Sequence, residues 1–156
     1  MNIDYRKYYA LLATLIVIVD RWTKHIVMYD ISHYKINQFA SIDLVFNRGI
    51  SFGMFHSDNN IIFAAVNIVI GCVIAMLVVH SYERLKIGKS IVGEISIFAG
   101  AISNIVDRCM YGGVVDFIAL SYLDWHFAVF NVADVFIFCG VMLMLILEYS
   151  QSCQKY

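Results

Sequence analysis

The sequence predicts an all-α membrane protein with four transmembrane helices. Of the 156 residues, 61% are hydrophobic and 15% are charged, whereas soluble domains are roughly half apolar and about a quarter charged. Four separate segments are apolar enough to cross a bilayer, which takes about 20 residues per helix. This length leaves no room for a second domain, so we expect residues 1–156 to form one integral membrane domain.

The four predicted spans are residues 8–28, 61–79, 91–106 and 132–149. The first span follows Arg6 and Lys7, as the apolar run of a signal peptide would. It ends in Asp20, Arg21 and Lys24 without a small-residue cleavage site, so we interpret it as a retained span.

The distribution of charge predicts the orientation in the membrane. With four spans, both termini and the connection between the second and third spans lie on one side. That side holds six of the eleven basic residues: Arg6, Lys7, Arg84, Lys86, Lys89 and Lys155. Because basic residues accumulate in cytoplasmic loops, we expect cytoplasmic termini. Most aspartates lie on the other side or at helix ends facing it: Asp20, Asp30, Asp43, Asp58, Asp107, Asp116, Asp124 and Asp134.

Two connections on the non-cytoplasmic side are expected to have structure of their own. Residues 41–55 alternate between apolar and polar side chains around Asn47-Arg48-Gly49, a pattern typical of a hairpin-like β element. Residues 111–125 contain a Gly112-Gly113 break and are expected to form a short extracytoplasmic loop or helix. Neither segment can bury a core by itself, so both should rest on the bundle end or the lipid interface.

Ionisable groups near the helix ends need an explanation, because a charged side chain in hydrocarbon costs about 3 kcal/mol. Asp20 and Lys24 are four residues apart, in the favourable order for a helical ion pair. They either cap the helix end, with the charged groups extended towards water, or support a functional site. Asn47 belongs either to a turn or to a site that aligns an extended peptide.

Small residues recur at helical spacing in the third span: Gly93, Ser96, Gly100 and Ser103. Such a stripe favours close packing against another helix. The stripe is followed by Asn104, Asp107 and Arg108. Either a structural ion pair or a helix C-terminal cap would explain Arg108.

Two aspartates are the candidates for acid–base chemistry. Asp116 lies among valines and Phe117, and it is either an ordinary loop aspartate or a buried functional group. Asn131 and Asp134 have the spacing of a capping box at the start of the fourth span. Two carboxyl groups held close together cannot both ionise, so one could activate water while the other donates a proton to an amide carbonyl.

Other chemistries lack their characteristic residues in this sequence. There is no GxSxG motif, no cysteine–histidine signature and no HxxxH or HExxH spacing, so neither a metal nor a cofactor is expected. The net charge of −1 provides no basic patch for nucleic acid. Two alternatives stay open. One is a small ion- or proton-coupled transporter, for which only Glu94 lies deep enough, and the other is a non-catalytic membrane subunit that binds a partner through the third span.

Five motifs, in order along nearly the whole chain, resemble those of lipoprotein signal peptidase, also called signal peptidase II. They are Asp20-Arg21-Trp22-Thr23-Lys24, Asn47-Arg48-Gly49-Ile50-Ser51-Phe52-Gly53, Ala99-Gly100-Ala101-Ile102-Ser103-Asn104-Ile105-Val106-Asp107-Arg108, Gly113-Val114-Val115-Asp116-Phe117-Ile118 and Phe130-Asn131-Val132-Ala133-Asp134. The resemblance implies a metal-independent aspartic endopeptidase. Such an enzyme removes the signal peptide from diacylglyceryl-modified bacterial prolipoproteins and cuts N-terminal to the lipidated cysteine.

The resemblance also assigns residues and a location. It implies that Asp116 and Asp134 form the catalytic dyad. Residues matching positions that contact substrate or hold the dyad are Asn47, Asn104, Arg108 and Asn131, with Gly100 in the same set of motifs. Asp20, Lys24 and Asp107 match positions whose role in the family is mainly structural. Ala99 and Ser103 stand where the family often has glycine, and residues 41–55 match its β-cradle. We expect a monomer in contact with lipid in the bacterial cytoplasmic (inner) membrane, with its active site near the outer leaflet.

Overall fold

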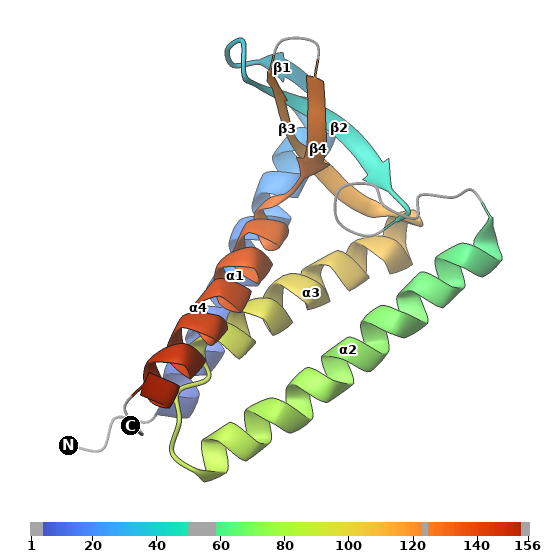
Figure 1. Cartoon of the computed structure of the whole chain (residues 1–156). Helices are drawn as coiled ribbons and strands as arrows, with labels where there is room; N and C mark the ends of the chain where they lie inside the picture. The colour runs from blue at the N-terminus through green and yellow to red at the C-terminus, as the bar shows by residue number, and fades with distance from the viewer. Residues whose placement is uncertain (1–4, 50–58, 123–124, 154–156) are drawn as a thin grey trace.

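The described part of the protein consists of four helices and a small antiparallel sheet (Figure 1). The structure, a computed structural model, describes residues 5–49, 59–122 and 125–153. The helices are α1 (Tyr5–Tyr29), α2 (Asn60–Lys86), α3 (Val92–Tyr111) and α4 (Val132–Cys153). Each overlaps one of the four predicted segments. Helix α2 ends at Lys86, seven residues past the predicted boundary at 79.

Two of the helices, α2 and α4, are long and apolar enough to cross a membrane. The other two carry charged side chains, Asp20, Arg21 and Lys24 in α1 and Glu94, Asp107 and Arg108 in α3. The count of four spans therefore remains a prediction for α1 and α3.

A four-stranded sheet lies at one end of the helices, which we call the sheet end (Figure 1). Its strands are β1 (His33–Lys35), β2 (Ala40–Asn47), β3 (Val114–Tyr122) and β4 (Trp125–Phe130), in the order β1-β2-β3-β4 with antiparallel neighbours. The prediction of a loop or short helix after Gly112-Gly113 is wrong, because this segment pairs with β2 as strand β3. The small β element expected beside the helices is present, as a four-stranded sheet to which this segment contributes. Pairing between strands some 70 residues apart leaves no local sequence signal.

The hairpin-like element predicted for residues 41–55 is confirmed as a strand only in its first half. Strand β2 covers that half, and its partners are β1 and β3. Residues 50–55, the second half of the prediction, lie outside the described residues. The turn from α3 into β3 uses Gly112, whose φ of 71° is left-handed and unfavourable for other residues.

Helices α3 and α4 pack closely through glycines. A Cβ atom added to Gly93 would lie 2.7 Å from the carbonyl oxygen of Gly140, and one added to Gly100 would lie 2.7 Å from that of Ala133. The predicted packing role of the small-residue stripe is thus confirmed at both glycines of α3. The partner is the start and middle of α4, so this contact also positions the first turn of that helix.

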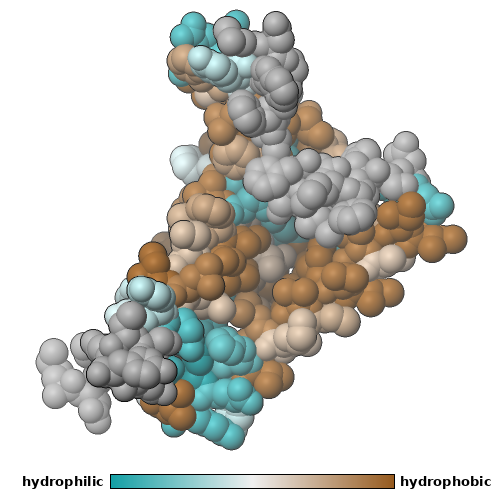
Figure 2. Space-filling view, viewed as in Figure 1, coloured by the Kyte–Doolittle hydropathy of each residue, from teal (hydrophilic) through white to brown (hydrophobic). Residues whose placement is uncertain are grey.

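Helix α2 stands apart from the other three helices (Figure 1). Of its 27 residues only Val66 and Arg84 are buried. Hydrophobic residues cover the helices between the two ends of the molecule (Figure 2). A helix that is apolar on all sides yet exposed within the protein is typical of a membrane span that faces lipid.

The far end of α2 is tied to the bundle by ion pairs. Arg84 lies 2.8 Å from Glu94 of α3 and 2.7 Å from Glu148 of α4. The Arg84–Glu94 contact has the distance of a hydrogen bond but not its angles, so it is an ion pair rather than a hydrogen bond. We call this end, where α1 begins, α2 passes to α3 and α4 ends, the distal end.

Candidate active site

The candidate site lies where β2 and β3 meet the ends of α1, α3 and α4. Its residues come from all five elements, and the structure brings all ten predicted site residues into one region. Those that are buried are Asp20, Lys24, Asn47, Gly100, Asp107, Arg108, Asp116 and Asn131, while Asn104 and Asp134 are half-buried.

Two carboxyl groups, on different elements, both accept hydrogen bonds from one residue, Asn131. Asp116 of β3 accepts hydrogen bonds from Nδ2 of Asn131 at 2.6 Å and from Nδ2 of Asn47 at 2.9 Å. Asp134 of α4 accepts from Nδ2 of Asn104 at 2.9 Å and from the backbone N–H of Asn131 at 3.3 Å. Asp116 is therefore held by side chains from other parts of the fold, and the interpretation as a loop aspartate bonded to local backbone is wrong.

The capping box predicted for Asn131 and Asp134 is present. The backbone N–H of Asp134 donates to Oδ1 of Asn131 at 3.0 Å, and Asp134 returns the contact through the backbone N–H of Asn131. Asn131 and Asp134 therefore cap α4 and take part in the candidate site at the same time. At this capping position Asp134 lies at the positive end of α4.

Each amide of the site has its orientation set by a second contact. Oδ1 of Asn131 accepts from the backbone N–H of Asp134 at 3.0 Å, and Oδ1 of Asn47 accepts from that of Gly49 at 2.8 Å. Oδ1 of Asn104 accepts from the ammonium of Lys24 at 2.8 Å. Because each oxygen is occupied by a donor, each NH2 group faces a carboxylate.

Lys24 is the centre of a buried ion cluster beneath the amides. Its side chain is 0% exposed, and its Nζ lies 2.7 Å from Oδ2 of Asp20 and 2.7 Å from Oδ2 of Asp107. The two carboxylates bind other parts of the fold: Asp20 accepts from the backbone N–H of Ala133 at 2.7 Å, and Asp107 from that of Val115 at 3.2 Å. The cluster therefore positions the first turn of α4 and the strand residue before Asp116. The alternative of a helix end with its charged groups extended towards water is wrong for Lys24.

Arg108 holds backbone rather than capping its own helix. It donates to the carbonyl oxygen of Gly49 and, at 3.5 Å, to that of Arg48. Its guanidinium also lies 5.8 Å from the ring centre of Phe63 on α2. Neither proposed explanation, an ion pair or a helix cap, describes these contacts, which join α3 to the end of β2 and the start of α2.

Two contributors to the site were not among the predicted residues. Arg21 pairs with Asp107, and Ser103 donates to Oδ2 of Asp20 at 2.6 Å. Arg21 is next to Asp20 in the sequence, and Ser103 belongs to the small-residue stripe, but neither position predicts a partner on another helix.

A cavity of about 300 Å³ opens at the two carboxyl groups. Its polar end is formed by Asn47, Asn104, Arg108, Asp116 and Asp134. Its other walls are apolar residues of α2, α3, β3 and α4: Val69, Ile70, Val73, Ile74, Leu77, Ile97, Ala101, Ile105, Val114 and Ile137. The cavity could therefore hold a ligand with a polar group beside an apolar one.

Burial raises the pKa of Asp116 to about 7, and the negative charge of Asp134 adds to this effect. The hydrogen bonds from Asn47 and Asn131 and the charge of Lys24 act in the opposite direction without cancelling it. Near neutral pH the pair can therefore hold one proton between two carboxyl groups, the state required for combined acid and base catalysis.

Fold and site together define a helical membrane protein with a paired-carboxyl site at one end of its bundle. The family model for signal peptidase (SPase) II matches residues 12–150, so the chain belongs to the signal peptidase II family. This is a family of membrane peptidases that process prolipoproteins.

Individual relatives agree with this assignment. The chain is 32% identical to a lipoprotein signal peptidase of Pelagibacter ubique over 94% of its length and 92% of the relative's. It is 40% identical to one of Anaplasma marginale over 76% of its length and 71% of the relative's. A solved structure described as a bacterial membrane enzyme superposes with a TM-score of 0.76 at 26% identity, covering 96% of this chain and 92% of the other.

Proposed function

We propose that this protein is an aspartic endopeptidase that removes the signal peptide from diacylglyceryl-modified bacterial prolipoproteins, cutting N-terminal to the lipidated cysteine. Asp116 and Asp134 are its catalytic pair. The observation that carries the proposal is that Asn131 binds both carboxyl groups, donating to Asp116 at 2.6 Å from its side chain and to Asp134 at 3.3 Å from its backbone. The reaction needs neither a metal nor a cofactor.

The two carboxyl groups have different roles in the proposed mechanism. Asp134, at the positive end of α4, is the ionised base and takes a proton from a water molecule. The water oxygen attacks the carbonyl carbon of the scissile amide, while protonated Asp116 donates its proton to the carbonyl oxygen. When the tetrahedral intermediate collapses, Asp116 regains that proton as the carbonyl reforms. Asp134 passes its proton to the leaving nitrogen, so both groups return to their starting states.

The walls of the cavity suit a lipidated peptide. The aspartates and the amides of Asn47 and Asn104 lie at its polar end, where the peptide bond would be held. Apolar residues, most of them from α2 and α3, form the remaining walls, where the diacylglyceryl group would lie. Substrate recognition thus combines amide hydrogen bonds with burial of hydrocarbon.

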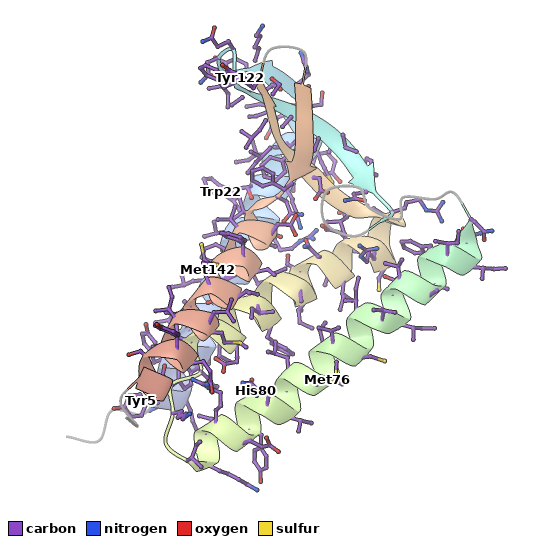
Figure 3. The ribbon with its side chains drawn as sticks, in the orientation of Figure 1. Tyr5, Trp22, Met76, His80, Tyr122 and Met142 are labelled. Atoms are coloured by element: carbon purple, nitrogen blue, oxygen red, sulfur yellow. The ribbon has the colours of Figure 1, made fainter. Side chains whose placement is uncertain are left out.

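We infer that all four helices span the bilayer and that residues 1–156 form one domain, active as a monomer. The charges of α1 support this inference, because Lys24 is fully buried against Asp20 and Asp107 instead of facing lipid. In this arrangement the termini lie in the cytoplasm and the sheet end lies at the outer leaflet of the bacterial cytoplasmic membrane. Trp22 and Tyr122, which are 65% and 54% exposed, lie towards the sheet end (Figure 3) and suit that interface.

The two alternative functions have less support. Glu94, the acid on which the transporter hypothesis depends, is paired with Arg84 near the distal end. The small-residue face of α3, on which the subunit hypothesis depends, packs against α4 at Gly93 and Gly100 and so is occupied within the chain.

The test is cleavage of a purified diacylglyceryl-modified prolipoprotein by the protein in detergent. Wild type should cut before the lipidated cysteine, whereas Asp116→Asn and Asp134→Asn should each lose at least about 1,000-fold in kcat, because each removes a proton-transfer group. Asp30→Asn, an exposed aspartate at the sheet end, is the matched control and should keep full activity. Near-full activity in either dyad variant, with folding intact, would exclude that aspartate from catalysis.

A further inference from the structure

A second cavity, of about 560 Å³, lies at the distal end, far from the aspartates. It is formed by the start of α1, the end of α2 and the residues that lead into α3. Its polar lining residues are Tyr5, Tyr8, Tyr9, Lys89 and Ser90. Leu85 and Val92 provide apolar wall beside them. The proposed peptidase reaction uses none of these residues.

The polar lining consists of groups that can donate hydrogen bonds to an anion. Lys89 contributes an ammonium group, and Ser90 and the tyrosines contribute hydroxyl groups. The backbone N–H of Ile91 donates to Oη of Tyr9 at 3.4 Å, which orients that hydroxyl so that its hydrogen is available to a ligand. An anion with several oxygens, such as a phosphate, matches this set of donors.

The charges around the cavity leave Lys89 available for such an anion. The acids of the adjoining elements α3 and α4, Glu94 and Glu148, both pair with Arg84. Within the described ranges no ion pair involves Lys89. The start of α3 adds to the positive potential, because among the described residues no side chain caps it.

The surroundings of the cavity indicate a lipid rather than a soluble ligand. Exposed tyrosines surround the distal end, with Tyr5 at 64%, Tyr82 at 59% and Tyr149 at 74% exposure, and Figure 3 shows Tyr5 there. Tyrosine gathers where a bilayer meets water. Hydrophilic residues are concentrated at this end of the molecule, directly below the apolar helices (Figure 2). A phosphate bound at Lys89 would thus lie at headgroup level, with the exposed apolar surface of α2 beside it for acyl chains.

We propose that this cavity binds the headgroup of an anionic phospholipid from the leaflet at the distal end, through Lys89, Ser90 and the hydroxyl of Tyr9. The proposal rests on the placement of the protein in a membrane and not on the assignment of the catalytic pair.

The test is native mass spectrometry of the delipidated protein in detergent, titrated with phosphatidylglycerol or with phosphatidylcholine. Wild type should bind one phosphatidylglycerol more tightly than phosphatidylcholine. Lys89→Ala and Lys89→Gln should each weaken phosphatidylglycerol binding about fivefold, the effect of one basic residue near an anionic headgroup, and leave phosphatidylcholine unchanged. Lys35→Ala, which removes the same charge from β1 at the sheet end, is the control and should change neither affinity.

Three outcomes would overturn the proposal. They are equal binding of the two lipids by wild type, unchanged phosphatidylglycerol binding in both Lys89 variants, and an equal loss in Lys35→Ala. A further titration adds inorganic phosphate at millimolar concentration to the protein with bound phosphatidylglycerol. Full displacement of the lipid would identify free phosphate as the ligand and exclude the lipid assignment. Prolipoprotein cleavage by the Lys89 variants in detergent should be unchanged, which separates this proposal from the proposed catalytic function.

Discussion

The ammonium of Lys24 donates to the side-chain oxygen of Asn104 at 2.8 Å, and this contact turns the amide nitrogen of Asn104 towards Asp134. A fully buried cation on α1 thereby sets which group of an amide on α3 faces a carboxylate on α4. The same cation pairs with Asp20 and Asp107. Asp20 binds the backbone of the first turn of α4, and Asp107 binds that of β3. The orientation of the amide and the positions of the two carboxyl groups consequently depend on one ion cluster.

Replacing Lys24 with methionine should destabilise the protein strongly. Methionine keeps the unbranched side chain as far as Cε but leaves Asp20 without a cation and Asp107 with only Arg21. Loss of one partner from a buried ion pair costs about 3–5 kcal/mol, which corresponds to a fall in Tm on the order of 10 °C. Thermal unfolding in detergent measures this, and Lys35→Met, an exposed lysine, should change Tm little. Equal Tm values for Lys24→Met and wild type would show that the cluster is not needed for stability.

The pH profile of cleavage should depend on Asp116. Because burial and Asp134 raise its pKa to about 7, Asp116 carries the required proton below that pH and loses it above. We therefore expect kcat/KM to fall as pH rises through about 7. The measurement is kcat/KM against pH in detergent, with substrate concentrations kept below KM. A profile that stays flat from pH 6 to 9, on the order of a thousandfold range in proton concentration, would contradict the acid role of Asp116.

Stability should follow the same group with a defined sign. A pKa raised from 3.8 to about 7 in the folded state means that the folded protein binds this proton more tightly than the unfolded chain. The resulting stabilisation is complete below 3.8 and is lost as pH rises through about 7. The Tm of wild type should therefore fall relative to that of Asp116→Asn across this interval. Parallel Tm curves for the two proteins would show that the Asp116 pKa does not differ between the folded and unfolded states.

Gly100→Ala should damage both stability and activity. Its Cβ would lie 2.7 Å from the carbonyl oxygen of Ala133 and 2.8 Å from Cγ1 of Ile137, so α4 must move at the turn that carries Asp134. Overpacking of this kind costs about 1–3 kcal/mol. The controls are Gly71→Ala, where the new Cβ meets nothing within 4 Å, and Gly93→Ala, which forces the same helices apart far from the site.

These two controls separate packing from catalysis when Tm and kcat are measured on all three variants. Gly71→Ala should be neutral or slightly stabilising, since alanine favours a helix by about 1 kcal/mol over glycine. Gly93→Ala should lower Tm while kcat falls much less than in Gly100→Ala. An equal fall in kcat for Gly93→Ala and Gly100→Ala would mean that helix separation anywhere, and not displacement of Asp134, limits the reaction.

Arg84→Met should loosen the attachment of α2. The change leaves Glu94, which is 1% exposed, without its ion pair at 2.8 Å, and it also removes the contact with Glu148. We expect a loss of about 3–5 kcal/mol, measured as a fall in Tm. The double variant Arg84→Met/Glu94→Met should recover most of it, because an apolar pair replaces a buried carboxylate that would otherwise have only the half-exposed His80, 3.7 Å away, as a partner. Failure of the second substitution to recover any stability would indicate that the important partner is Glu148 or the carbonyl oxygen of Ser90, to which Arg84 donates at 3.3 Å.

Much of the helical architecture could be predicted because it depends on local composition. Apolar runs of about 20 residues must hide their backbone polar groups in helices if they cross a bilayer, and the four predicted segments overlap α1 to α4. Asp116 and Asp134 were predicted as a pair mainly from the resemblance of the surrounding motifs. From the residues alone, Asp134 had an equally good explanation as part of a helix cap.

The helices, the concentration of aspartates towards one face and the capping box of α4 follow from local sequence, because each depends on residues close together in the chain. Residues 114–122, by contrast, form a strand through pairing with β2, which is a tertiary contact. Tertiary packing likewise joins Asp116 to Asp134 through Asn131 and buries Lys24 among Asp20, Asp107 and Asn104. Carboxylates and amides up to 113 residues apart interact only after the helices have packed, and the energies of such contacts depend on burial, which no local pattern encodes.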